Sequence, residues 1–496
     1  MIINKTYHKV KISFIYLLII FGTVFLISAC FQDEMKERPN FVFIIGDDIS
    51  VDDFGCYGHP TIRTPNIDHL AANGLKFTEA YLTTSQCSPT RSSIITGRYP
   101  HNTGSPELHM DLPEGQPLFP LELKNSGYYC VQAGKWHLGE SAKVGFNKVW
   151  DMDGGGPGGE ERWVECLQDR PKDKPFFLWL ASTDAHRPWK PDKNLEKHQP
   201  QDVVIPPYLI DTPAGRVDMA YYYDEIQRLD YYVGKVVEEL KQQGELENTC
   251  IIFIADNGRP FPRCKTRLYD SGIKTPLIIQ WPRGLKYKND VTQSLVSAID
   301  IAPTILELAD LKSSERIQGT SMIPILKNLD TRIREYAFAE HNWHVQIAHE
   351  RMVRWQNFVY IRNAHPQLPQ VCTLEDQCPA KELRTFYAAG KTTLAQADPI
   401  ISPRPAEELY VLSNDPYQLE NQVENSDYLD ELNHLRKTMD EWQERTGDTT
   451  PSLEKATPDR SNRKTGERYY KESRPPTGEL PGESRGATMI NDPGTK

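Results

Sequence analysis

The sequence predicts an α/β protein built around a large, mostly parallel sheet. Three apolar runs, at 41–45, 175–181 and 249–255, each end in polar residues. Runs of this kind are typical of parallel strands that are buried on both faces. The stretch 221–243 predicts an amphipathic helix of the scaffold. Its apolar residues recur at helical spacing: Ile226, Leu229, Val233, Val236, Val237 and Leu240.

The first 29 residues predict a secretion signal. Three lysines precede an apolar run, 13–27, which is short for a membrane span. Small residues stand directly before Cys30, as in the lipobox of bacterial lipoproteins. This pattern predicts that Cys30 is lipidated and anchors an exported protein to a membrane, facing the periplasm or the cell surface. Residues 30–38 would then be a tether. The alternative is an ordinary signal peptide with an incidental cysteine.

Polar side chains follow the first and the last of the three apolar runs. Asp47 and Asp48 come after 41–45, and Asp256 and Asn257 come after 249–255. Open α/β sheets bind ligands at the carboxyl ends of their strands. Adjacent carboxylates repel each other, so a pair at a strand end usually needs a cation. Solvated loop acids are the alternative, and Asp47-Asp48 taken alone favours that alternative. An all-oxygen set suits Ca²⁺ or Mg²⁺ better than Zn²⁺.

A nucleophile at the start of a helix is predicted at Cys87. Pro89 suits a first helical turn, residues 90–96 can form two turns, and Gly97 is a natural stop. Cys87 therefore lies where unpaired N–H groups and the helix dipole favour an anion. Arg91, one turn further on, can hold an oxyanion. The alternative is a buried structural cysteine.

Lys135 and His137 follow a predicted short helix, 120–127, and a predicted strand, 128–133. They alternate with Trp136, so an extended backbone would place a cation and an imidazole on the same face.

The motif Cys87-Ser88-Pro89-Thr90-Arg91, followed by Thr96-Gly97, resembles the signature of the type I, formylglycine-dependent sulfatases of the alkaline-phosphatase superfamily. The resemblance covers nearly the whole mature chain. It implies an alkaline-phosphatase-like α/β/α sandwich with a large, mixed, mostly parallel sheet over 39–330, and a smaller α+β subdomain over 331–447. It continues through further ordered motifs at 57–59, 64–68, 98–104 and 134–139.

The resemblance also implies the chemistry. A maturation enzyme would oxidise Cys87 to formylglycine, whose hydrate attacks the sulfur of a sulfate group before the resulting hemiacetal expels sulfate. One Ca²⁺ would be held by the side chains at Asp47, Asp48, Cys87, Asp256 and Asn257.

By the same resemblance, the sulfate pocket would contain Arg91, Lys135, His137, His186 and Lys265. His186 occupies the place of the family's active-site histidine, although Ala185 precedes it where proline is usual. His186 or Lys265 would protonate the leaving group. His137 would assist at the formylglycine hydroxyl.

The run 257–269 resembles the heparan N-sulfatase (sulfamidase) branch, and it includes Asn-Gly-x-Pro-Phe-Pro and a later Leu-Tyr. This implies a sugar sulfate, O-linked or N-linked, as substrate. Fragments of ulvan, carrageenan or glycosaminoglycans would fit an exported bacterial enzyme.

Shorter predicted strands, at 336–340 and 358–362, and a helix at 428–446 make up the C-terminal subdomain. His341 and His344 are candidates for substrate binding because the subdomain can present an exposed strand at the pocket, with Trp343 offering a ring face to a sugar. Solvent-exposed strand residues are the alternative. The polar tail, 448–496, is either disordered or wrapped around the domain.

The net charge of the chain bears on which partners it can bind. A formal net charge of −11 argues against nucleic acid as a partner. Two alternatives remain, namely a phosphonate monoester or phosphodiester hydrolase of the same superfamily and a non-catalytic glycan-binding lipoprotein.

Cys372 and Cys378 flank a short polar loop, which predicts a local disulfide in an exported chain.

Overall fold

The structure is a computed structural model that describes residues 38–150, 158–190, 192–371 and 378–496. Residues 39–496 form one compact unit. The predicted signal segment with Cys30 lies outside the described residues, as does the predicted disulfide of Cys372. Within the described part of the chain, no helix combines the length and the apolar character needed to cross a bilayer.

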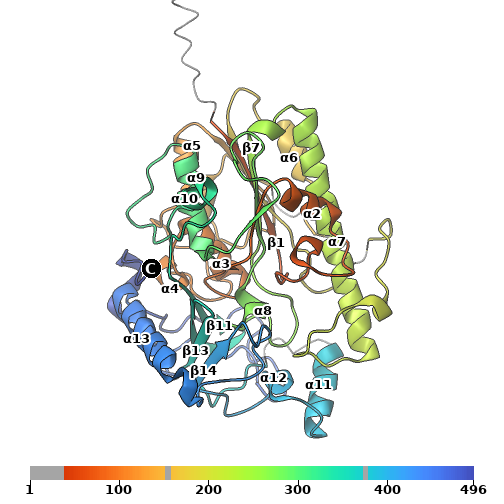
Figure 1. Cartoon of the computed structure of the whole chain (residues 1–496). Coiled ribbons are helices and arrows are strands. Elements are labelled where there is room, and N and C mark those ends of the chain that lie inside the picture. Colours follow the sequence, from red (N-terminus) through yellow and green to blue (C-terminus); the bar gives the residue numbers. More distant parts are fainter. Residues whose placement is uncertain (1–37, 151–157, 191, 372–377) are drawn as a thin grey trace, which may run out of the picture. The chain divides into compact units, whose positions relative to one another are not determined.

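The large sheet has eight strands, and β1 lies at its centre (Figure 1). β1 pairs in parallel with β6 on one side and β7 on the other, so that Phe43 faces Trp179 and Ile252. β8 runs antiparallel to β7, which makes the sheet mixed and mostly parallel, as predicted. Across the sheet the strands are β5 (Lys148–Trp150), β4 (Tyr129–Gly134), β6 (Phe176–Ala181), β1 (Asn40–Gly46), β7 (Thr249–Ala255), β8 (Leu277–Gln280), β2 (Leu75–Phe77) and β9 (Asp290–Thr292).

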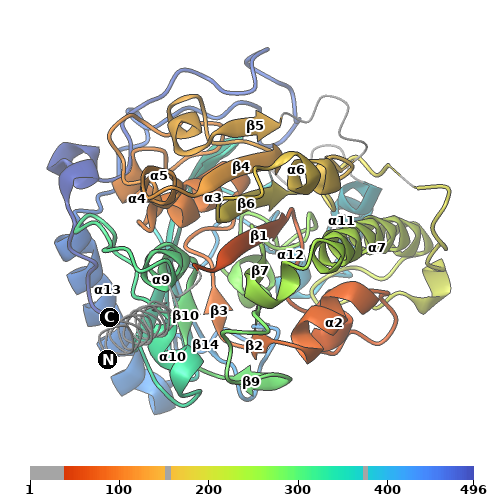
Figure 2. The same ribbon diagram turned by 90° about the horizontal axis from the view of Figure 1, so that it is seen from above.

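Helices cover both faces of this sheet (Figure 2). Alternate residues of β1 point into two different cores: Phe43 packs on the side of α3, and Ile44 on the side of α7. One face carries α2 (Pro65–Ala72), α6 (Trp163–Asp169) and α7 (Pro213–Gln242). The other carries α3 (Cys87–Thr96), α4 (Pro100–Thr103), α5 (Phe119–Asn125), α9 (Ile301–Leu308) and α10 (Ile323–Lys327). The layers are those of an α/β/α sandwich.

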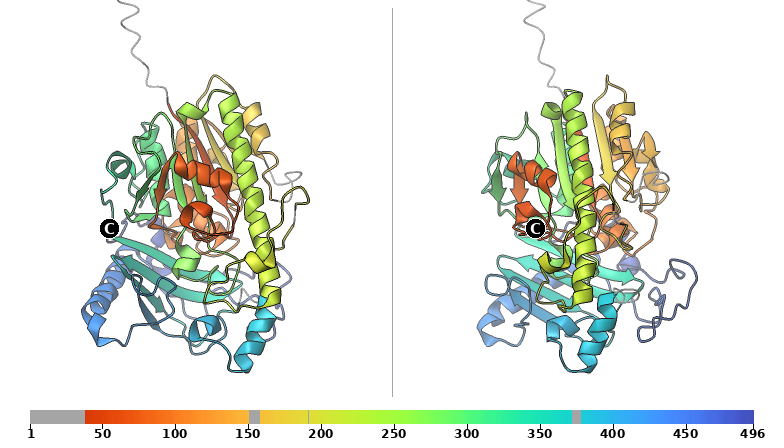
Figure 3. Two further views of the ribbon diagram at one scale, coloured as in Figure 1. Left: turned by 45° about the vertical axis from the view of Figure 1, so that its right-hand side comes forward. Right: turned by 90° about the vertical axis from the view of Figure 1, so that its right-hand side faces the viewer.

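The second sheet is antiparallel and lies at one end of the large sheet in both views of Figure 3. α13 packs on it through Trp442, whose ring stacks on Phe338 at a centroid distance of 4.8 Å. Its order is β11 (Tyr336–His344), β12 (Gln346–Trp355), β13 (Phe358–Asn363) and β14 (Glu407–Val411). The accompanying helices are α11 (Cys378–Ala388), α12 (Leu394–Ala397) and α13 (Leu429–Thr446). The remaining elements are the pair β3 (Ala80–Tyr81) and β10 (Val296–Ser297), and the short helix α8 (Asp270–Ile273).

Residues 448–496, called the C-terminal segment below, contact the chain just after α3 and also contact β11 of the second sheet. Arg98, directly after α3, donates hydrogen bonds to the carbonyls of Thr488 at 3.2 Å and Ile490 at 2.8 Å. The indole of Trp343, on β11, donates to the carbonyl of Pro458 at 2.9 Å. The C-terminal segment thus connects the end of α3, the helix that begins at Cys87, to the second sheet.

Candidate active site

The helix α3 begins at Cys87. Gln86 precedes it in an extended conformation, and Gly97 ends it with a left-handed φ of 65°. Cys87 is only 2% exposed, and burial raises the pKa of its thiol to about 12. Because the thiolate is the nucleophilic form of cysteine, an unmodified Cys87 is a poor nucleophile at neutral pH.

Three carboxylates surround the cysteine. Gly46 at the end of β1 is paired with Ala255 at the end of β7, so the acids that follow the two strands meet. Ligand atoms of Asp47, Asp48, Cys87 and Asp256 all lie within 4.8 Å of one another. We call these four residues the acidic cluster. The sulfur of Cys87 is 3.6 Å from Oδ1 of Asp47 and 3.8 Å from Oδ1 of Asp48.

Asn257 completes the donor set. Its Nδ2 donates to Oδ1 of Asp48 at 2.7 Å, while its own Oδ1 is buried without a hydrogen-bond partner among the described residues. A buried orphan oxygen next to three carboxylates calls for a cation. Burial, followed by the charge of Asp47, raises the pKa of Asp256, although the neighbouring Arg91 opposes this shift. The donors, all hard oxygens, fit a divalent cation such as Ca²⁺.

Three cations face the acidic cluster. Arg91 holds Asp256 through Nε at 2.9 Å and Nη2 at 2.7 Å. Lys135 forms an ion pair with Asp47, and Nζ of Lys265 lies 2.7 Å from Oδ1 of Asp48. Burial opposes the charged form of Lys265, but Asp48, Cys87 and Asp47 together outweigh burial and raise the pKa of this lysine. The pocket therefore has fixed positive charges for an anionic substrate.

His186 lies at the edge of this pocket. Its side chain is 42% exposed, and its Nε2 is 3.9 Å from Oδ2 of Asp48. The charge of Lys265, followed by burial, lowers the pKa of His186. The imidazole is placed to contact a group that leaves toward solvent.

His137 reaches the site in a different way from the one predicted. β4 ends at Gly134, and His137 has a left-handed φ of 57°, so a loop and not strand alternation positions it beyond Lys135. Burial and then the charge of Lys135 lower its pKa well below the ordinary value. The prediction of one extended face for Lys135 and His137 is therefore wrong in its geometry, although both residues are near the acidic cluster.

The expected exposed strand at His341 is wrong. His341 is 0% exposed, and its Nδ1 lies 3.6 Å from Oε2 of Glu350, inside the second sheet's ion network. Trp343 is 2% exposed and is covered by the C-terminal segment, so its ring face is not available to a sugar. His344 ends β11 near Lys265, whose charge contributes after burial to lowering its pKa. Of the two histidines, His344 remains the candidate.

Sequence reasoning missed His109. It is exposed, and its Nδ1 lies 2.8 Å from Nε2 of His137. The residue belongs to no helix or strand and to no spaced motif. Only tertiary packing brings it to His137, so no periodic signal in the sequence could have found it.

Comparison with known proteins gives the family. The sequence profile of the family described as Sulfatase matches residues 39–159 and 160–311. A second profile, described as N-sulphoglucosamine sulphohydrolase, C-terminal, matches residues 264–394. An ulvan-active sulfatase of Formosa agariphila is 30% identical over 473 residues, which are 84% of this chain and 76% of that protein.

Two further proteins are similar over most of their length. Human N-sulphoglucosamine sulphohydrolase is 27% identical over 83% of this chain and 91% of its own. The crystal structure of the phosphonate monoester hydrolase of Agrobacterium radiobacter superposes with a TM-score of 0.64 at 19% identity, covering 81% of this chain and 95% of that one. This last likeness concerns the fold alone. The profile match and the relatives together show that the chain belongs to the sulfatase family, as a sulfuric ester hydrolase with an alkaline-phosphatase-like fold.

Proposed function

We propose that this protein removes O-linked or N-linked sulfate from sugars of sulfated polysaccharides, using formylglycine at position 87 and one Ca²⁺. The observation that carries the proposal is the acidic cluster around Cys87, faced by Arg91, Lys135 and Lys265. Such a site binds a cation on one side and a sulfate group on the other.

In the proposed reaction, the formylglycine, the Ca²⁺ and the three cationic side chains have different roles. Formylglycine at position 87 would supply a hydrated aldehyde whose hydroxyl can attack sulfur. The oxygens of Asp47, Asp48, Asp256 and Asn257 would hold Ca²⁺, which would favour loss of the proton of that hydroxyl. The three cationic side chains bind sulfate oxygens and stabilise the charge that develops on them.

Two histidines can move protons in this site. His186, at the exposed edge, is placed to protonate the leaving oxygen or nitrogen, because a bound sulfate raises the pKa of a neighbouring imidazole. Lys265 is the alternative acid. His137 serves the hydroxyl of residue 87.

The substrate class rests on the relatives. Their names refer to ulvan and to N-sulphoglucosamine, both sulfated sugars. Ulvan, carrageenan and glycosaminoglycan fragments are therefore the candidates. Lipidation of Cys30 would hold the enzyme on a membrane that faces these polymers, in the periplasm or at the cell surface.

A phosphonate monoester or phosphodiester hydrolase is the second candidate. The observation in its favour is the fold shared with a phosphonate monoester hydrolase. A non-catalytic glycan-binding lipoprotein is disfavoured by the intact nucleophile, acids and cations. Matched assays on an aryl sulfate and an aryl phosphodiester separate the first two.

The test uses protein co-expressed with a formylglycine-generating enzyme. Mass spectrometry of the peptide containing Cys87 should show the aldehyde in place of the thiol. Desulfation of defined oligosaccharides from the three polymer classes should follow the aldehyde content, and Cys87→Ala should be inactive. Full activity in protein that carries only unmodified Cys87 would refute the mechanism, and faster turnover of the phosphodiester would refute the reaction class.

A further inference from the structure

Two histidines near the nucleophile share an uncommon backbone conformation. His109 has a φ of 61° and His137 a φ of 57°. A left-handed φ raises the conformational energy of residues other than glycine. Such residues are found where the surrounding structure fixes them, often at functional sites. Here both strained residues face each other.

The two imidazoles are in direct contact. Nδ1 of His109 lies 2.8 Å from Nε2 of His137, and the ring centroids are 4.8 Å apart. The other nitrogen of His137, Nδ1, is buried and has no hydrogen-bond partner in the described part of the chain. His109 therefore occupies one nitrogen of His137 and leaves the second one available.

His109 is held in place from three parts of the molecule. Its backbone N–H donates to Oγ of Ser88, next to Cys87, at 2.9 Å. Leu108 N–H donates to the carbonyl of Trp343 on β11 at 3.1 Å. Arg474, from the C-terminal segment, donates to the carbonyl of Leu108 at 2.8 Å. This loop is built to a fixed geometry and is not an open surface turn.

The electrostatic surroundings keep both rings neutral. The His109 ring is exposed on one side but loses water where it packs against the protein; this desolvation and then the charge of Lys135 lower its pKa to about 4. Burial and then the charge of Lys135 lower the pKa of His137 well below its ordinary value. Two neutral imidazoles share a single proton in their hydrogen bond. Since Arg91 and Lys265 also lower the pKa of His137, its free nitrogen is favoured as a lone pair over a second N–H.

We propose that His109 is a positioning residue that accepts the Nε2 proton of His137 in a hydrogen bond and thereby keeps Nδ1 of His137 as a hydrogen-bond acceptor for the hydroxyl of residue 87. No bond breaks in this arrangement: the hydroxyl donates a hydrogen bond to the lone pair of Nδ1, while Nε2 keeps its proton and the ring stays neutral. The inference rests on the proposed function for its hydroxyl. The hydrogen bond itself is independent of that function.

The first experiment needs no turnover. NMR of protein labelled on the histidine ring nitrogens reports which nitrogen of His137 carries the proton, with His137→Asn to assign the signal. We expect the Nε2–H tautomer in the wild type and a mixture in His109→Gly. Glycine accepts a positive φ without strain, so this variant removes the ring and relaxes the loop. An Nδ1–H tautomer in the wild type, or an unchanged tautomer in the variant, would overturn the proposal.

The second experiment measures kcat and KM on an aryl sulfate and on the preferred saccharide. His109→Gly should lower kcat about 10- to 100-fold on both, the usual cost of losing a residue that orients an active-site histidine. His109→Asn, which tolerates a positive φ and can accept the hydrogen bond, should restore most of the loss. His69→Asn, on the exposed surface of α2, is the matched control.

The outcomes separate this inference from the proposed function. An inactive wild type carrying the aldehyde would count against the function. An active wild type with an equally active His109→Gly would overturn only the role of His109. A loss confined to the saccharide would show that His109 contacts the sugar, and an asparagine variant no better than glycine would show that the hydrogen bond is not what matters.

Discussion

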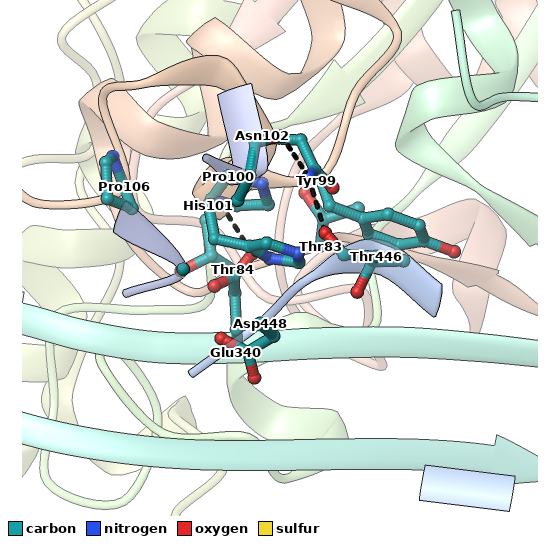
Figure 4. Close-up of polar contacts among 12 residues, drawn as sticks. Thr83, Thr84, Tyr99, Pro100, His101, Asn102, Pro106, Glu340, Thr446 and Asp448 are labelled. Atoms are coloured by element: carbon teal, nitrogen blue, oxygen red, sulfur yellow. Dashed lines mark hydrogen bonds and ion pairs between the residues drawn. The ribbon is translucent and has the colours of Figure 1, made fainter. Parts of the chain in front are cut away.

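Among the described residues, two fully buried clusters place metal-ligand atoms within 4.8 Å of one another. One is the acidic cluster, and the other is formed by His101, Glu340 and Asp448 between α4, β11 and the C-terminal segment (Figure 4). In the second cluster the acids are already paired. Glu340 Oε1 accepts from the N–H of His101 at 3.0 Å and lies 2.9 Å from its Nδ1, and Arg351 holds both oxygens of Asp448 at 2.7 Å.

The two clusters have similarly short distances between their ligand atoms, but the pKa values of Asp448 and Asp256 are shifted in opposite directions. Burial favours the neutral form of Asp448, but Arg351 outweighs it and holds the pKa of Asp448 well below the usual range. The pKa of Asp256 is raised, and Asn257 keeps an oxygen without a partner among the described residues. Both clusters pair their carboxylates with cationic side chains, but beside the acidic cluster Oδ1 of Asn257 is left without a partner among the described residues, and such an oxygen can bind a cation.

The largest expected effect is at Asp256. Asp256→Asn keeps the shape of the side chain but removes a charged ligand, so it should abolish bound calcium and lower kcat/KM by about 10³-fold, since a metal supplies several kcal/mol of transition-state stabilisation. Metal analysis and aryl sulfate kinetics measure both. Undiminished turnover in a metal-free variant would show that the reaction does not need the metal, and an unchanged metal content would show that Asp256 is not a ligand.

At Asp448 the expected loss is of stability. Asp448→Asn removes one partner of a buried ion pair and should lower the free energy of unfolding by about 3–5 kcal/mol, with calcium content unchanged. Urea unfolding measures it. Asp492→Asn is the matched control, because its pair with Arg445 is 40% to 47% exposed and such pairs contribute about 0–1 kcal/mol. Equal effects of the two variants would contradict the difference between buried and exposed pairing.

Acid should also weaken the buried ion pair between Glu350 and Arg267, which stabilises the second sheet. Glu350 accepts from Arg267 at 2.9 and 3.0 Å; although burial favours its neutral form, Arg267 and His341 lower its pKa to about 2. A lowered acid pKa adds stability above the ordinary value of 4.5, and that stability is lost as the pH falls toward 2. Thermal unfolding between these pH values should show the loss, and Glu350→Gln should flatten it. A variant with the wild-type slope would refute this.

The smallest expected effect concerns substrate choice. His344→Ala should lower turnover of a sulfated oligosaccharide about 10-fold and leave an aryl sulfate nearly unchanged, because sugar contacts differ only in the first. His341→Ala should instead reduce thermal stability, since its ring is buried beside Glu350. Equal losses on both substrates in His344→Ala would place that residue at the sulfate group or in folding.

The sequence was informative where residues follow regular elements. The apolar runs that became β1, β6 and β7 predicted the sheet, and Asp47 and Asp256 follow from strand ends that must meet in a parallel pair. His109 and the burial of Trp343 were not predictable in this way. Both depend on contacts with an irregular, polar stretch of chain, whose path no hydrophobic period encodes.

The covering of Trp343 has a consequence for the timing of synthesis. Gln86, the residue before Cys87, donates to the carbonyl of Trp343 at 3.0 Å, and Arg474 lies over the Trp343 ring at 5.1 Å. Ribosomes add about 5–20 residues per second, so the roughly 390 residues from Cys87 to Arg474 take about 20–80 s to translate. Until Arg474 emerges, the packing around Trp343, which belongs to the same buried cluster as Cys87, is incomplete. If Cys87 is oxidised to formylglycine as proposed, the distance along the chain would set an interval in which a modifying enzyme could reach the thiol before the C-terminal segment covers Trp343.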